Sequence, residues 1–155
     1  MKRLILFSAL LFSTLCVTIA QTSPEWYPKV DDAAATFVTS QGDEEQVEIG
    51  NSYDAPFTVT FSANPIDTIG YDVLYEWKIE QVKNGVPKLL VMRNEENTTY
   101  TFTEGGVEVN YSIILAITYR HRETGVEGEG GAEPITFSLR GSSLVLYNAF
   151  SPNGD

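Results

Sequence analysis

Few side chains in this sequence have the chemistry of acid–base or nucleophilic catalysis. His121 is the single histidine among 155 residues, and it stands between Arg120 and Arg122. A serine or cysteine nucleophile assisted by histidine would depend on this one residue. We interpret His121 as a solvated side chain at the end of a strand. A zinc site is disfavoured as well, because zinc prefers several histidine and cysteine ligands.

Pairs of carboxylates are the other catalytic arrangement that the sequence offers. Glu76 and Glu80 lie four residues apart in a predicted strand, so their side chains share one face at a separation of about 13 Å. Glycosidases hold their two carboxyl groups about 5–9.5 Å apart. Glu127 and Glu129 lie in a glycine-rich segment that would not hold them in a defined geometry. We therefore predict no catalytic residues and expect that the protein is not an enzyme.

Acidic residues also form candidate calcium sites, because calcium takes oxygen ligands from loops. One candidate is the run Asp43, Glu44 and Glu45, and the other is Asn153 with Asp155. Neither set has the ligand spacing of an EF-hand loop. An ordinary charged surface explains both sets and is the interpretation that we favour. No cofactor is expected.

Aromatic side chains allow a different function, because exposed rings stack on the apolar faces of sugars. Trp26 and Tyr27 lie outside the main strand pattern and are the two candidate ligand contacts. Five other aromatic residues have the spacing of core positions: Tyr71, Tyr75, Trp77, Tyr111 and Tyr119. A carbohydrate-binding accessory module of a secreted glycosidase is thus an alternative function, and it would depend on Trp26 and Tyr27.

The elements that would position these side chains are strands. From Val107 to Tyr119 every odd position is apolar, which predicts a long strand with one buried face. Tyr100 and Phe102 alternate with threonines before it, and the turn sequence Glu104–Gly106 lies between. We expect these two strands to form a hairpin in which the second strand is central.

Further strands are predicted on both sides of this stretch. Shorter alternating segments occupy residues 36–39, 46–49, 55–64, 71–79, 88–93 and 135–139. Asn84-Gly85 is typical of a two-residue hairpin turn, because both residues accept positive φ. The glycine- and glutamate-rich residues 121–132 are expected to form a loop. About seven to eight strands without helical periodicity predict an all-β, antiparallel β-sandwich.

The N-terminus has the features of a secretory signal peptide. Lys2 and Arg3 precede a short apolar run, and small residues end the segment 1–20. Acylation at Cys16 is the alternative, although Leu15 does not fit the small residues that a lipoprotein signal requires. Removal of residues 1–20 takes away two cations and changes the formal charge from −11 to −13. A surface so acidic disfavours nucleic acid and anionic lipid as partners.

Three segments carry a resemblance to a known family. Residues 56–63 read Pro-Phe-Thr-Val-Thr-Phe-Ser-Ala, residues 75–77 read Tyr-Glu-Trp, and residues 99–102 read Thr-Tyr-Thr-Phe. Together they resemble polycystic-kidney-disease-type (PKD) domains, which are immunoglobulin-like sandwiches that act as spacers and interaction modules in bacterial surface proteins. The family usually follows its tryptophan with Gly-Asp-Gly, a turn that is missing after Trp77. The resemblance implies a divergent PKD-like domain over residues 35–142, after an extended lead-in at 21–34.

The C-terminal residues carry a second resemblance. Residues 144–155 read Leu-Val-Leu-Tyr-Asn-Ala-Phe-Ser-Pro-Asn-Gly-Asp. This resembles the opening of the gliding-motility-associated C-terminal domain of Bacteroidetes, a sorting signal of the type IX secretion system. The family continues with Gly-x-Asn-Asp, so we expect residues 143–155 to be the truncated start of such a domain. The resemblance implies the type IX secretion machinery as a partner.

These observations lead to one expected function. The sequence predicts an exported, non-catalytic module located in the periplasm, on the outer-membrane surface or outside the cell. Its expected role is spacing or protein–protein contact, through strand edges or loops. A protein or a glycan at the cell surface is the expected partner.

Overall fold

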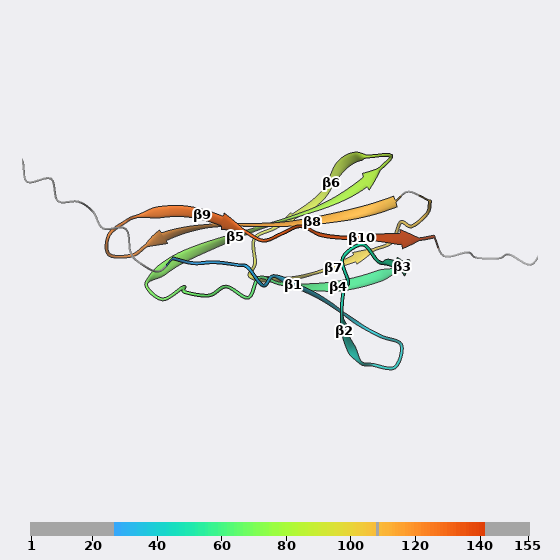
Figure 1. Cartoon of the computed structure of the whole chain (residues 1–155), viewed down its shortest axis with the longest axis horizontal. Coiled ribbons are helices and arrows are strands. Elements are labelled where there is room, and N and C mark those ends of the chain that lie inside the picture. Colours follow the sequence, from blue (N-terminus) through green and yellow to red (C-terminus); the bar gives the residue numbers. More distant parts are fainter. Residues whose placement is uncertain (1–26, 108, 142–155) are drawn as a thin grey trace, which may run out of the picture.

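The computed structural model describes residues 27–107 and 109–141, and their regular structure is all β-strand (Figure 1). The described strands are β1 (Ala34–Val38), β2 (Glu44–Gln46), β3 (Ser52–Asp54), β4 (Phe57–Ser62), β5 (Tyr71–Lys83), β6 (Val86–Arg93), β7 (Asn97–Phe102), β8 (Val109–His121), β9 (Glu127–Gly131) and β10 (Ile135–Arg140). Among these residues there is no helix of the length and apolarity that crossing a membrane requires.

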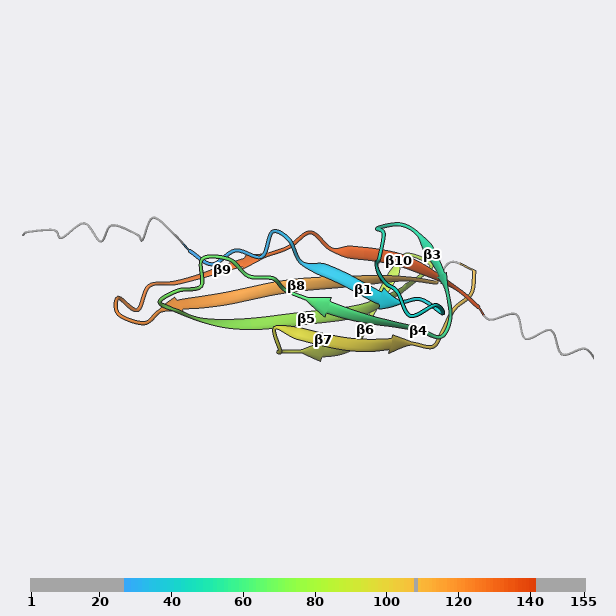
Figure 2. The same cartoon turned by 90° about the horizontal axis from the view of Figure 1, so that it is seen from below.

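The strands form two sheets that pack face to face, which confirms the predicted β-sandwich. One sheet has the order β2-β1-β4-β7, and all of its pairs are antiparallel. The other has the order β3-β10-β8-β5-β6, with β9 beside β8. Only β3 and β10 pair in parallel among the described strands. Figure 2 shows β1 and β4 in front of the longer strands β5 and β8, and β7 in front of β6.

β5 and β8 are the longest strands and form the centre of their sheet. Each has 13 residues, and they pair along their whole length from Tyr71 opposite His121 to Lys83 opposite Val109. The alternation seen in the sequence is the alternation between the buried face and the outer face of this pair. β5 then turns into β6 through Asn84 and Gly85, whose φ angles are 52° and 75°. The predicted hairpin turn and the long central strand are both confirmed.

The predicted hairpin between the strands on either side of Glu104–Gly106 is wrong. β7 belongs to one sheet and β8 to the other, so residues 103–107 cross the sandwich instead of folding one strand back on its neighbour. Main-chain contacts hold this crossing: Gly106 N–H donates to the Leu139 carbonyl at 2.9 Å. At Gly105 a Cβ atom would overlap the carbonyl oxygen of Arg140. Glycine is required at position 105 because the backbone passes close to β10 there.

Three short strands were not predicted where the structure has them. β9 occupies most of the segment that was expected to be a loop, and it pairs with β8 from Ala116 to Arg120. β3 lies between the predicted strands 46–49 and 55–64, and β2 begins two residues before the first of them. The main chain of these segments pairs with the edges of longer strands. Their side chains contribute little burial, so no hydrophobic alternation marks them in the sequence.

Aromatic rings form most of the core where the two sheets overlap. Trp77 is fully buried on β5, and its indole nitrogen donates to the Glu95 carbonyl at 3.0 Å. The rings that contact one another here come from both sheets: Phe57, Phe61, Trp77, Phe102, Tyr111 and Phe137. We call this part the closed half.

The other half of the long strands extends past the first sheet. Here the inner face of β5, β8 and β9 is covered by residues 27–33 and 63–70 (Figure 1). Lys29 and Ile66 join these two segments by a pair of main-chain hydrogen bonds of 3.2 and 3.0 Å, and Val30 is buried beneath them. The lead-in seen in the sequence is thus packed against the strands from residue 27 onward. We call this part the extended half.

Candidate interaction surface

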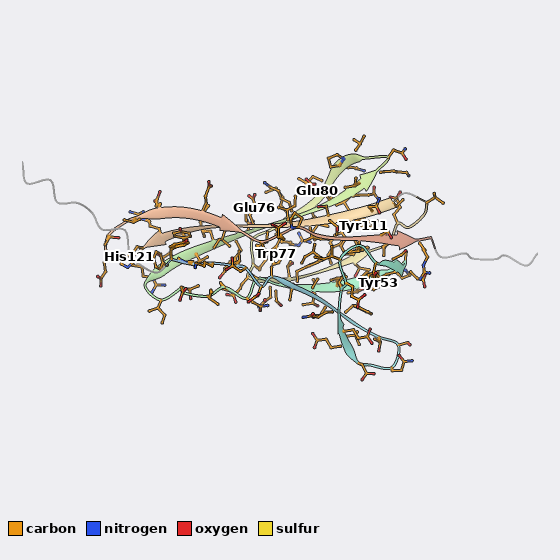
Figure 3. All side chains as sticks on the ribbon, in the orientation of Figure 1. Tyr53, Glu76, Trp77, Glu80, Tyr111 and His121 are labelled. Atoms are coloured by element: carbon orange, nitrogen blue, oxygen red, sulfur yellow. The ribbon has the colours of Figure 1, made fainter. Side chains whose placement is uncertain are left out.

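His121 has a structural environment at the end of β8. Its Nδ1 accepts the main-chain N–H of Thr124 at 3.2 Å, and its ring packs edge-on against Tyr71 with centroids 4.9 Å apart. Gly70 lies against the other ring nitrogen. These contacts hold the turn between β8 and β9. Figure 3 shows His121 near one end of the molecule, away from Glu76 and Glu80.

The carboxylate pairs are parts of ion-paired outer faces. Glu76 and Glu80 lie on the same face of β5, as their spacing predicted. Glu76 contacts Lys78 at 2.9 Å, and the hydrogen bond and charge of Glu76 raise the pKa of that lysine. Glu127, on β9, lies 3.7 Å from Arg120. The described geometry gives no pair of carboxylates converging on one point.

The candidate calcium ligands are not brought together. Asp43, Glu44 and Glu45 are exposed on the β1–β2 hairpin, and Glu44 and Glu45 alternate between the two faces of β2. In residues 27–107 and 109–141 no group of three or more acidic, histidine or cysteine side chains has the arrangement of a metal site. Asn153 and Asp155 lie outside the described residues.

Tyr27 makes contacts within the protein. Its ring stacks on Tyr119 with centroids 6.3 Å apart, and the Lys29 ammonium lies 5.1 Å from the ring centroid. The side chain is half exposed, at 47%. These contacts explain Tyr27 as part of the cover over the extended half, without a sugar. Trp26 lies outside the described residues.

A buried polar network, which sequence reasoning missed, lies at the start of β8. Gln81 is the only polar side chain buried in the described core, and its amide donates to the Tyr111 hydroxyl at 3.3 Å. That hydroxyl donates in turn to the main-chain carbonyl of Glu104. Hydrogen bonds from Gln81 and Lys83 lower the pKa of the Glu104 carboxyl, while burial raises the pKa of Tyr111. The network ties β5 and β8 to the crossing segment and provides no reactive group.

The outer face of the extended half is shallow and open. Leu74 is 71% exposed there, beside Ala116 and Thr118, in a groove of about 720 Å³ whose rim includes Glu76 and Glu129. Neighbouring charges form ion pairs across this face, such as Arg122 with Asp72 at 2.7 Å. The groove has no enclosed wall and no cluster of converging polar atoms, so it lacks the geometry of a catalytic pocket.

β6 is the surface with the most unusual combination of properties. Three of its apolar side chains are exposed: Val86 at 67%, Leu89 at 49% and Met92 at 42%. Residues 77–93 contain four lysines and arginines and one glutamate, in a chain with a formal charge of −11. Lys88 and Arg93 take part in none of the described ion pairs. We call Val86–Arg93 the β6 edge.

The β6 edge also has unpaired main-chain groups. Among the described strands β6 pairs with β5 alone, and a bulge at Ile79/Glu80 interrupts the register of that pair. In Figure 1 β6 rises from the body of the sandwich together with the end of β5. Sequence reasoning predicted a strand at 88–93 but not its edge position. The signal was the apolar run Leu89–Met92 next to Pro87, which is typical of edge strands.

Comparison with known proteins identifies no relative of this chain, so the surface is interpreted from its geometry alone. No family model matches the chain, and neither the curated proteins nor the solved structures contain a significant match.

Proposed function

We propose that this chain is a non-catalytic β-sandwich module of an exported protein, and that it spaces or contacts other proteins. The observation that carries the proposal is the β6 edge, which combines exposed apolar side chains with two cations that take part in none of the described ion pairs and with a strand edge that no other described strand covers. Extended segments of partner proteins bind such edges by adding a strand. Most of the other described cations are engaged in surface ion pairs: Lys78, Lys83, Arg120, Arg122 and Arg140.

The sandwich is further proposed to be immunoglobulin-like, in line with the PKD resemblance. Immunoglobulin-like domains carry a buried tryptophan on their third strand, and a tyrosine near the start of the sixth strand bonds back to the preceding main chain. Trp77 on β5 and Tyr111 on β8 have these two environments. The grouping of β1, β4 and β7 against β5, β8 and β10 supports the same assignment.

Export and sorting are proposed from the sequence alone. Residues 1–20 favour a signal peptide, and residues 144–155 resemble the opening of a type IX sorting domain. Both segments lie outside the described residues. Protease treatment of intact host cells tests this part: we expect loss of the protein, detected with an antibody, while a periplasmic control protein survives. Survival of both proteins would contradict surface exposure.

A photo-crosslinking amino acid tests the contact function. Placed at Leu89 on the β6 edge and expressed in the native host, it should give a discrete protein adduct on irradiation. The matched control position is Thr60, which is exposed on the central strand β4 of the other sheet. Adducts of equal intensity from both positions, or from neither, would contradict a contact role for this edge.

A further inference from the structure

Two surfaces of opposite charge project from opposite sides of the sandwich. The β6 edge rises on one side in Figure 1, and the hairpin of residues 38–46, formed by the end of β1 and by β2, projects on the other. This second surface, the acidic hairpin, exposes Asp43, Glu44 and Glu45, none of which takes part in a described ion pair. Val38, opposite Glu44 in the register, is 70% exposed. Each surface therefore combines charge with apolar area.

Both surfaces also have an unpaired strand edge. Among the described strands β2 pairs only with β1, and β6 pairs only with β5. An edge strand presents a row of free N–H and C=O groups that another chain can pair with. Pro87 and Lys88 protect the start of β6, but Leu89–Arg93 contains no proline and offers a continuous edge. The acidic hairpin offers a short strand with three exposed side chains.

Charge decides which edges fit together. Antiparallel pairing of two copies of β6 about its middle would place Lys88 opposite Val91 of the other copy and diagonal to Arg93, within reach of these long side chains. Pairing of two acidic hairpins would bring carboxylates together. Like charges placed opposite each other on neighbouring strands are destabilising, so neither self-pairing is favoured. Pairing a β6 edge with the free edge of β2 places cations beside carboxylates, while Val38, on the next strand β1, lies one strand further from Leu89 and Met92.

We propose that a second copy of this chain binds to the β6 edge through its acidic hairpin, so that copies associate head to tail. The two surfaces differ and lie on opposite sides, so a bound copy leaves its own β6 edge free for the next. Contacts of this kind generate rings or open filaments. The inference rests on the proposed contact function and names the partner.

Sedimentation velocity of the purified protein tests the proposal. Between about 10 μM and 1 mM, the range of weak protein–protein affinities, the average sedimentation coefficient should rise with concentration in low salt. It should rise less in about 1 M salt, where charges are screened beyond about 3 Å. The double variant Lys88→Glu/Arg93→Glu should weaken association at least about tenfold, because like charges then meet across the contact.

Matched variants separate this contact from a general effect of charge. Arg120→Glu/Arg140→Glu changes the net charge equally but lies off the β6 edge, so association should persist. Glu44→Lys/Glu45→Lys should also abolish self-association, and mixing it with Lys88→Glu/Arg93→Glu should restore association. A wild-type protein that stays monomeric at the highest concentration overturns the proposal. Association that survives both charge reversals also overturns it.

The photo-crosslinking experiment at Leu89 distinguishes failure of this inference from failure of the proposed function. An adduct with the mass of two copies agrees with head-to-tail association. An adduct with a different protein, together with a monomeric purified chain, overturns the second copy as partner and leaves the contact function standing. The absence of any adduct specific to Leu89 overturns both.

Discussion

The closed and extended halves of the long strands are built by the same alternation but are covered in different ways. In the closed half the other sheet covers β5 and β8, and rings from both sheets meet, such as Phe61 with Trp77 at 5.7 Å. In the extended half two segments without regular strands provide the cover, and Tyr119 and Tyr75 are only partly buried. An alternating pattern thus shows that a face is covered, but not by which element.

The residues that stabilise the fold and the residues that are candidates for contact lie in different parts of the molecule. Most fully buried large side chains belong to the closed half, including Trp77, Tyr111 and Phe102. The candidate contact surfaces, β6 and the acidic hairpin, lie at the sides of the closed half, where the sheets end. We expect substitutions in the core to reduce stability without changing a specific contact, and substitutions at the edges to do the reverse.

The largest expected effect comes from Trp77→Ala. Truncation of a buried aromatic side chain costs about 3–5 kcal/mol, which is a large part of the stability of a single domain. The matched control is Leu74→Ala on the same strand, where a side chain that is 71% exposed should cost little. Chemical denaturation measures both free energies of unfolding. It is followed by far-ultraviolet circular dichroism, because this backbone signal does not depend on Trp77. Equal costs would mean that the buried and outer faces of β5 do not differ in packing.

The next effect concerns the crossing segment, where two adjacent glycines differ in their surroundings. A Cβ at Gly105 would overlap main-chain atoms of Arg140, whereas a Cβ at Gly106 would meet a Val109 methyl group at an ordinary 3.7 Å. Gly105→Ala should destabilise by about 1–3 kcal/mol. Gly106→Ala should be close to neutral. The same denaturation measurement compares them, and a reversed order would contradict the close approach to β10.

Removing one tyrosine hydroxyl from each half compares how much a hydrogen bond contributes to stability in the two halves. Tyr111→Phe removes the hydrogen bond from buried Gln81 and the one to the Glu104 carbonyl, and should cost about 1–3 kcal/mol because both are lost in a buried network. Tyr75→Phe removes a 3.3 Å hydrogen bond to the exposed Glu96 and should cost less than about 1 kcal/mol. Comparable losses in the two variants would show that the network at Gln81 is accessible to water.

The smallest expected effect is a loss of stability at alkaline pH. Burial is the main cause that raises the pKa values of Tyr75, Tyr111 and Tyr119, with a further contribution from Glu96 at Tyr75. Because the folded values exceed the unfolded value of about 10, this stability is complete below pH 10 and is lost as the pH rises through the folded values. Ultraviolet titration should show tyrosines that ionise later than in the unfolded chain. Identical titration curves for folded and unfolded protein would contradict the prediction.

The candidate surface was only partly predictable from the sequence. The composition of residues 77–93 and the run Leu89–Met92 are visible in the sequence and mark a basic, apolar strand. That β6 is the last strand of its sheet depends on which strands pair with β5 and β8, and those partners are distant in sequence. The acidic run Asp43–Glu45 was a candidate metal site because the sequence does not show that these residues lie on a hairpin that projects from the sandwich.

The sequence by itself determined the strands whose side chains alternate, the Asn84-Gly85 turn and Trp77 as a core residue. These features depend on local chemistry: side-chain period, positive φ and burial of a large ring. Only the tertiary structure decided that β7 and β8 belong to different sheets, that β9 is a strand, and that residues 27–33 cover the extended half. Those outcomes depend on main-chain hydrogen bonds between distant segments, and main-chain groups are the same in almost every residue. The pattern of side chains therefore carries little information about them.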